Sequence, residues 1–151
     1  IQNMLISNKP DNDGILTVFQ KIPSDITDKA ETLLKFVGLH QKRKLRAGDL
    51  SFGQQKLLEL AMALMNEPKM LLLDEPTAGI NPTLINGIID RLISVNKDYG
   101  ITLLVIEHNM KVIMNLAQRV FCLAHGQMLA NGTPDEIKND KRVLDAYLGA
   151  Q

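Results

Sequence analysis

Apolar residues recur at the three-to-four-residue spacing of amphipathic helices in several parts of the chain. The expected helices cover residues 30–37, 51–67, 84–95, 110–117 and 142–148. The residues placed to end the first three helices are Gly38, Pro68 and Gly100. Two helix starts carry the capping-box pattern, Ser51 with Gln54 and Thr133 with Glu136. The pattern therefore predicts helices with defined ends.

Short, almost continuous apolar runs alternate with these helices. The expected strands are residues 69–74, 101–106, 120–124 and 127–130. The first two are predicted to be buried on both faces, and the last two to be joined through His125 and Gly126. Up to Gly48 the chain is more irregular, with turn residues at 10–14 and a break at Pro23. The alternation is typical of an α/β domain with a parallel sheet.

Composition narrows the class of protein. The 151 residues include 17 Lys and Arg against 17 Asp and Glu, so bulk charge gives no support to a nucleic-acid binder. The apolar runs are far shorter than the roughly 18 to 20 residues that span a bilayer.

The run 40–46 is interpreted as a surface connector with solvated charges. The single cysteine, Cys122, excludes an internal disulfide and is expected as a small core residue. Because Ile1 comes first, we expect the chain to be trimmed or to begin inside a longer reading frame.

Two motifs carry the first candidate chemistry. In Leu50–Gln55, Ser51 and Gly53 present a hydroxyl and free amides beside the positive end of a helix dipole, which is an anion site as well as an ordinary cap. In residues 70–76, a buried strand ends in two carboxylates. Asp74 can hold Mg²⁺ directly or through water, and Glu75 can deprotonate a water that attacks a phosphoryl group. An acidic pair that opens a loop is also common without any function.

Two further motifs follow in the sequence. The loop 77–82, rich in Gly and Pro, comes directly after the acids and would otherwise be interpreted as a turn. His108 comes just past the second buried strand, where it can hydrogen-bond a terminal phosphate. A solitary histidine at such a place is also often structural or merely exposed. His40 and His125 lie in polar turns and are assigned no role.

Together the four motifs resemble the nucleotide-binding ATPase domains of ABC transporters, in the family's order and across most of the chain. The matching segments are Leu50–Gln54 (signature motif), Leu71–Glu75 (Walker B), Ala78–Asn81 (D-loop) and His108 (switch histidine). Phe52 where the signature usually has Gly, Asn81 where Asp is commoner, and residues 107–110 and 132–149 most resemble branched-chain amino-acid uptake ATPases. The lipopolysaccharide-export ATPase is a close second.

The resemblance implies the parallel-sheet core of a P-loop NTPase with part of a helical subdomain and without its N-terminal half. Residues of about 1–66 would form the helical part with the signature motif, and about 67–151 the second half of the catalytic core. An ATPase of this class needs a G-x-x-x-x-G-K-[ST] loop, yet none of the ten glycines is followed by Lys. No glutamine in residues 1–50 has the context of the family's Q-loop.

The resemblance also implies cofactors and partners. These are ATP and Mg²⁺, a second ATPase subunit in a head-to-tail dimer, and permease subunits that hold the protein at the inner face of the cell membrane. The residues expected to close over ATP of the partner subunit are Ser51, Phe52, Gly53 and Gln54, with Asn81 in the D-loop. Asp74, Glu75 and His108 would serve the ATP of their own subunit. The chain alone is expected to be inactive and to associate with itself through an unpaired sheet edge.

Rival interpretations belong to other classes. A soluble ABC ATPase of DNA repair or translation would carry the same motifs. A truncated, non-catalytic module that only binds a partner would explain why the phosphate loop is missing. The transported solute is not predicted, because membrane and binding-protein subunits select it.

Overall fold

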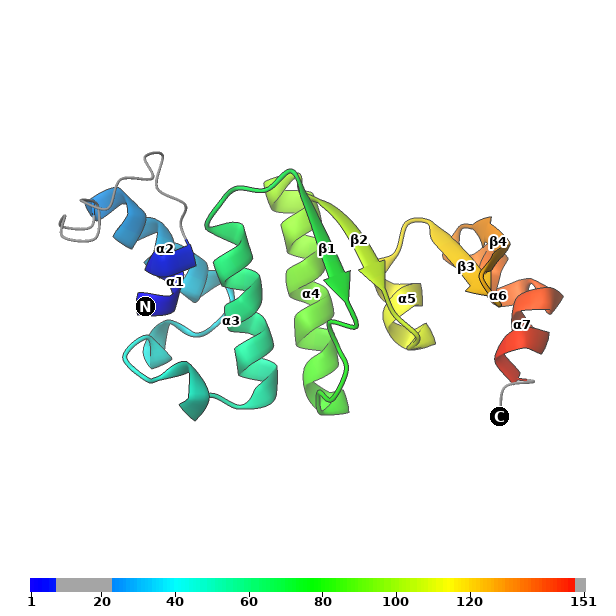
Figure 1. Cartoon of the computed structure of the whole chain (residues 1–151), viewed down its shortest axis with the longest axis horizontal. Coiled ribbons are helices and arrows are strands. Elements are labelled where there is room, and N and C mark those ends of the chain that lie inside the picture. The colour runs from blue at the N-terminus through cyan, green and yellow to red at the C-terminus, as the bar shows by residue number, and fades with distance from the viewer. Residues whose placement is uncertain (8–22, 149–151) are drawn as a thin grey trace. The chain divides into compact units, whose positions relative to one another are not determined.

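A computed structural model describes residues 1–7 and 23–148 (Figure 1). The chain divides into two compact units, Ile1–Val105 and Ile106–Gln151. The helices and strands are α1 Gln2–Ser7, α2 Ser24–Phe36, α3 Phe52–Leu64, β1 Met70–Asp74, α4 Pro82–Tyr99, β2 Thr102–Ile106, α5 Met110–Leu116, β3 Val120–Ala124, β4 Gln127–Gly132, α6 Pro134–Asn139 and α7 Lys141–Leu148. Two short 3₁₀ helices, η2 His40–Lys42 and η3 Ala47–Asp49, precede α3. The turn predicted at residues 10–14 lies outside the described residues.

The predicted elements are confirmed in kind and order, and several of their ends follow the signals in the sequence. Helix α3 ends at Leu64, before the predicted stop at Pro68, and α2 begins at Ser24, before the predicted start at residue 30. Gly100 ends α4 with a left-handed backbone, φ +67°. Thr133 and Glu136 form the predicted capping box at the start of α6. Helix α1 was not predicted, because six residues are too few to show a helical period.

The helices α1, α2 and α3 pack together in the first unit (Figure 1). Their shared core contains Met4, Ala30, Leu33, Leu34, Leu60, Ala61 and Leu64. The Glu31 carboxylate binds the His40 ring at 3.1 Å and the Arg43 guanidinium at 3.5 Å, so it ties η2 to α2. The interpretation of residues 40–46 as a connector with merely solvated charges is therefore wrong for His40 and Arg43, because Glu31 lies within reach of both.

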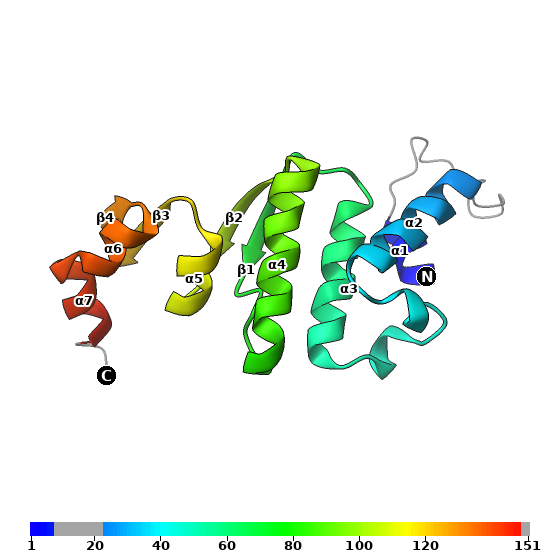
Figure 2. The same ribbon diagram turned by 180° about the vertical axis from the view of Figure 1, so that it is seen from behind.

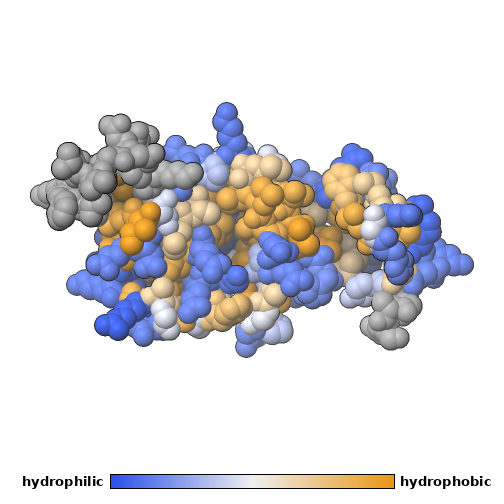
Figure 3. All heavy atoms as spheres, in the orientation of Figure 1, coloured by the Kyte–Doolittle hydropathy of each residue, from blue (hydrophilic) through white to orange (hydrophobic). Residues whose placement is uncertain are grey.

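The strands β1 and β2 form a two-stranded sheet and run in the same direction (Figure 1). Helix α4 covers one face of this sheet (Figure 2), and Leu71 of β1 is buried. On the other face Met70 is 46% exposed, Leu72 72% and Leu104 46%. Figure 3 shows apolar residues gathered over this part of the molecule. The apolar runs of β1 and β2 require cover on both faces, but the first unit supplies it on one side only, so the expected burial is met on one face and an apolar surface stays exposed on the other.

The second unit is built on the antiparallel hairpin of β3 and β4. Its two-residue turn is His125 and Gly126, both with positive φ, +48° and +76°, which matches the twist of a tight hairpin. Ala130, Ile137 and Val143 form a small core between β4, α6 and α7. The half-buried Cys122 packs against that core. The predicted hairpin is confirmed, whereas Cys122, expected in the core, is only partly buried at its edge.

Candidate functional site

Ser51 is the N-cap of α3, and the capping box predicted from the sequence is present. The Ser51 hydroxyl oxygen accepts a hydrogen bond from the Gln54 amide at 3.4 Å. The Gln54 side-chain oxygen accepts one from the Ser51 amide at 3.1 Å. Ser51 and Phe52 are exposed, whereas Gly53 is buried. The helix start is therefore fixed in place and open to solvent at its positive end.

The segment that leads into α3 is anchored by side chains that the sequence interpretation did not single out. The Gln55 side-chain nitrogen donates to the backbone oxygens of Ala47 and Leu50, each at 3.2 Å. The Lys42 ammonium donates to the Gln54 side-chain oxygen at 3.2 Å. The doubled glutamine in the sequence was the available signal: one glutamine closes the capping box, and the other holds the preceding loop.

The structure brings the signature-like segment and the loop after β1 into contact. A Cβ atom placed on Gly53 would lie 3.6 Å from the Ile80 side chain and 3.6 Å from the Leu84 side chain. A Cβ atom placed on Gly79 would lie 3.2 Å from the Phe52 ring. Two motifs that are more than twenty residues apart in the sequence therefore form one surface.

Asp74 ends β1 and Glu75 follows it, and both side chains are exposed. The backbone of Glu75 is left-handed, φ +45°, a conformation that residues with a side chain rarely adopt. The loop then tightens, because the Ala78 amide donates to the Glu75 carbonyl at 3.1 Å and the Ile80 amide to the Thr77 carbonyl at 3.2 Å. The predicted acids thus lie where β1 turns sharply, and strain of this kind is often found at functional sites.

Asn81 has a structural role at the end of this loop. Its side-chain oxygen accepts hydrogen bonds from the Thr83 amide at 3.0 Å and from the Thr83 hydroxyl at 2.9 Å, so it caps α4. Pro82 occupies the first position of that helix, where its missing amide hydrogen costs nothing. The predicted contact of Asn81 with nucleotide stays a prediction.

His108 lies in the second unit, exposed, between β2 and α5. Its neighbours fix the local backbone: Asn109 caps α5 by accepting from the Lys111 amide at 3.1 Å, and Glu107 accepts from the Asn109 amide at 3.3 Å. Because Glu75 belongs to the first unit, the shared site of Glu75 and His108 stays a prediction.

Asp74 is the residue expected to hold Mg²⁺. Within residues 1–7 and 23–148, no group of three or more His, Cys, Asp or Glu side chains could hold a metal ion. An exposed carboxylate still fits Mg²⁺, which binds few protein oxygens and takes its other ligands from phosphates and water. For ATP the fit is partial, because the helix start at Ser51 offers amides to an anion while the sequence has no phosphate loop.

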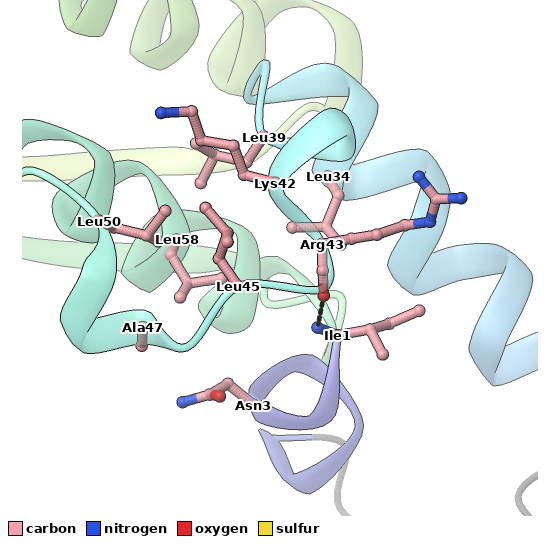
Figure 4. Close-up of a pocket in the computed structure, with 10 residues that line it drawn as sticks. All are labelled: Ile1, Asn3, Leu34, Leu39, Lys42, Arg43, Leu45, Ala47, Leu50 and Leu58. Atoms are coloured by element: carbon pink, nitrogen blue, oxygen red, sulfur yellow. Dashed lines mark hydrogen bonds between the residues drawn. The ribbon is translucent and has the colours of Figure 1, made fainter.

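A pocket in the first unit touches these motifs only at Leu50, the first residue of the signature-like segment. Aliphatic side chains of Ile1, α2, α3 and residues 39–50 line most of it, and the Ile1 amino group donates to the Arg43 carbonyl at 2.8 Å (Figure 4). Burial lowers the pKa of that amino group. None of the eight predicted site residues lines this pocket.

None of the helices that the structure describes is long and apolar enough to cross a membrane.

Two protein families match parts of this chain. The family described as ABC transporter matches residues 3–78, and the family described as branched-chain amino acid ATP-binding cassette transporter matches residues 127–151. The first match contains the capped start of α3 and the acids after β1. The second begins at β4.

Two curated relatives are similar to this chain in sequence. The high-affinity branched-chain amino acid transport ATP-binding protein LivG of Salmonella typhimurium is 37% identical over 131 residues, which are 87% of this chain and 51% of the relative. The probable branched-chain amino acid transport ATP-binding protein LivG of Methanocaldococcus jannaschii is 36% identical over 158 residues, 99% of this chain and 61% of the relative. The chain thus spans between half and two thirds of the length of these curated relatives.

A solved structure supports the same fold. The crystal structure of the ADP conformation of MJ1267, described as an ATP-binding cassette of an ABC transporter, superposes with a TM-score of 0.81 and 32% sequence identity. The match covers 98% of this chain and 61% of that chain. The predicted fold class is therefore confirmed, whereas the predicted division near residue 66 stays a prediction.

Proposed function

Because this chain belongs to the ABC transporter family of ATP-binding proteins, we propose that it forms part of the ATP-hydrolysing subunit of a branched-chain amino-acid importer. The names of its relatives and the match of residues 127–151 favour this solute class over lipopolysaccharide export and over repair or translation. The chain spans 51% of the LivG relative, so the activity belongs to a protein that also supplies a phosphate loop.

The observation that carries the proposal is the contact between the capped start of α3 and the acidic loop after β1. A helix start with free amides attracts phosphate, and a carboxylate at the end of a strand can activate water. The contact between them runs through Gly79 and Ile80, which belong to the loop that Glu75 opens. In the proposed protein, Ser51, Phe52, Gly53 and Gln54 face ATP held by a second subunit.

The acidic residues act within their own subunit. Asp74 would hold Mg²⁺, directly or through water, and the ion would offset the charge of the phosphate oxygens. Glu75 orients a water and accepts its proton as the water oxygen bonds to the terminal phosphorus. The bond from that phosphorus to the bridging oxygen breaks, and ADP and phosphate are the products. His108 donates a hydrogen bond to the terminal phosphate, and Asn81 contributes from the D-loop. Each of these roles comes to this chain from the family motif that the residue matches.

The same proposal sets the partners and the place of action. Two ATPase subunits meet head to tail, and permease subunits hold them at the inner face of the cell membrane. We propose no nucleic-acid partner, since the chain has 17 basic and 17 acidic residues.

The decisive experiment substitutes Glu75 by Gln in a complete protein that joins this chain to a phosphate-loop half. Loss of the base should lower kcat by about 10² to 10⁴ fold and leave the Kd for ATP nearly unchanged, because a general base acts in the transition state. The matched control is Glu59→Gln, an exposed glutamate of α3 that pairs with Lys56, and it should keep full turnover.

Two results would contradict the proposal. One is a Glu75→Gln protein that binds ATP poorly yet keeps its turnover, which would mean that another residue is the base. The other is a complete protein without ATP hydrolysis, which would favour the non-catalytic module.

A further inference from the structure

Phe52 is the residue at which this chain departs from the usual signature sequence, and its ring has a defined place. It is 52% exposed, and the Lys56 ammonium lies 5.7 Å from the ring centroid. The ring also lies against Gly79 of the loop that follows the acids. A half-exposed aromatic side chain is therefore held between its own helix and the D-loop.

Gly79 is suited to this contact in two ways. Its backbone is left-handed, φ +69°, which disfavours any residue with a side chain. An added Cβ would also lie 3.2 Å from the Phe52 Cε1 atom, tighter than ordinary contact, so the ring would have to move. Gly100 has nearly the same backbone, φ +67°, but nothing lies within 4 Å of an added Cβ. Of these two glycines, Gly79 alone combines the backbone requirement with contact to a ring.

We propose that Phe52 is a positioning residue that couples the start of α3 to the loop 75–81, so that the two move together. The inference rests on the proposed function for the meaning of that loop, which Glu75 opens. A glycine at position 52, as in the usual signature sequence, has no side chain to make the contact. The coupling is therefore a property of chains with an aromatic residue at this position.

The mechanical consequence follows from the local contacts. Gly53 also packs on Ile80 and Leu84, so two successive residues of α3 rest on the loop and on the start of α4. When nucleotide binding displaces the start of α3, the Phe52 ring transmits this displacement to Gly79. Gly79 lies four residues after the proposed base, Glu75. Nucleotide held by one subunit would thus influence the base of the other site through an aromatic contact.

Hydrogen exchange on the 151-residue chain tests the positioning directly. The reporters are the amides of Ala78 and Ile80, which donate within the loop. In Phe52→Ala we expect their exchange to rise about tenfold, because loops that lose packing contacts open more often. Exchange at Leu33 and Leu34 of α2 should stay unchanged, and Phe52→Tyr should behave as the unsubstituted chain. Unchanged exchange in Phe52→Ala, or an equal rise in α2, would overturn the proposal.

A double-mutant cycle gives an independent answer. Gly79→Ala should lower the folding equilibrium constant by about tenfold in the unsubstituted chain and by only about threefold in the Phe52→Ala variant, because the ring contact is then absent. Gly100→Ala is the matched control, and its effect should be the same with and without Phe52→Ala. Additive effects of Gly79→Ala and Phe52→Ala would overturn the coupling.

The last measurement links the contact to turnover. In the complete protein, Phe52→Ala should lower kcat about fivefold with the KM for ATP within about twofold, because the loop position matters in the transition state. Phe52→Tyr keeps the ring, so its kcat should be higher than that of Phe52→Ala. A Phe52→Ala protein with unchanged kcat would overturn the link to catalysis. If the unsubstituted complete protein hydrolyses no ATP, the proposed function fails, while the exchange and cycle results still decide the positioning role.

Discussion

The Ser51 hydroxyl oxygen accepts a hydrogen bond from the Gln54 amide at 3.4 Å, while the Gln54 side chain accepts one from the Ser51 amide at 3.1 Å. This reciprocal pair uses only the acceptor side of the hydroxyl. A serine hydroxyl also has one hydrogen to donate. The cap and a contact with phosphate can therefore exist at the same time, and they can be separated by substitution.

Substituting Ser51 separates these two roles. Ser51→Ala should lower the unfolding free energy by about 1 kcal/mol, and Ser51→Gly by only a few tenths, since Gly is a tolerable cap. Both variants of the complete protein should weaken ATP-driven dimerisation, because both lose the hydroxyl. Urea unfolding and light scattering with Mg-ATP measure the two effects. Normal dimerisation of Ser51→Gly would leave only the capping role.

Replacing Glu75 by glycine should stabilise the chain. The left-handed backbone at φ +45° costs a residue with a side chain about 1 kcal/mol. We therefore expect Glu75→Gly to be more stable than Glu75→Ala by about this amount. The control is Asp74, the last residue of β1, where Gly should be less stable than Ala. Equal stabilities of the two Glu75 variants in thermal unfolding would contradict the strain at this position.

The 151-residue chain by itself should hydrolyse ATP no faster than the uncatalysed background. Phosphoryl transfer depends on positioned groups around the phosphates, and the sequence contains no phosphate loop. A sensitive phosphate-release assay checks this. Turnover that disappears in Glu75→Gln would contradict the expectation.

Local signals in the sequence identified much of the fold correctly. The caps at Ser51 and Thr133 and the end of α4 at Gly100 depend on neighbouring residues only, so a sequence pattern can contain them. The turn at His125 and Gly126 is local in the same way. Each of these features was predicted and is present.

The remaining features depend on parts of the chain that are distant in sequence. The contact of Phe52 with Gly79 joins two motifs, and no pattern within either motif predicts it. The ion pairs of Glu31 join α2 to η2. The burial of β1 depends on which elements cover it, and an apolar run indicates the need for cover without supplying it. The positive φ of Glu75 could not be predicted, because a positive φ is usually indicated by a glycine and this residue is a glutamate.

The helical part of the first unit should lose stability in acid through Glu31. The hydrogen bond from His40, followed by the charge of Arg43, lowers the pKa of Glu31 below its ordinary value of 4.5. A lowered pKa in the folded state means that the contribution is complete above the unfolded pKa and disappears as the pH falls through the folded pKa. Glu31→Gln should therefore flatten the loss of stability below about pH 4.5. An identical pH profile for both proteins in urea unfolding would contradict this role of Glu31.

The exposed face of β1 and β2 should make the chain associate with itself. Leu72, 72% exposed on β1, is the most exposed of the three apolar side chains named on this face. We expect Leu72→Lys to reduce association measured by light scattering over a range of concentrations, because a charge on the sheet opposes pairing. The control is Ile6→Lys, at a residue of α1 that is 84% exposed. Equal effects of the two substitutions would place the association elsewhere.

The exposed apolar face of β1 and β2 can be covered either by a segment of the same polypeptide or by a second copy of the chain. These two ways of covering the face compete with each other. A segment tethered in the same polypeptide acts at an effective concentration of about 1 mM. A second copy of the chain acts only at its own concentration, which at about 1 μM is roughly a thousand times lower. The relatives that this chain matches over 51% and 61% of their length carry additional sequence that can act in the tethered way. Dilution should therefore separate copies of the 151-residue chain but leave a tethered cover in place.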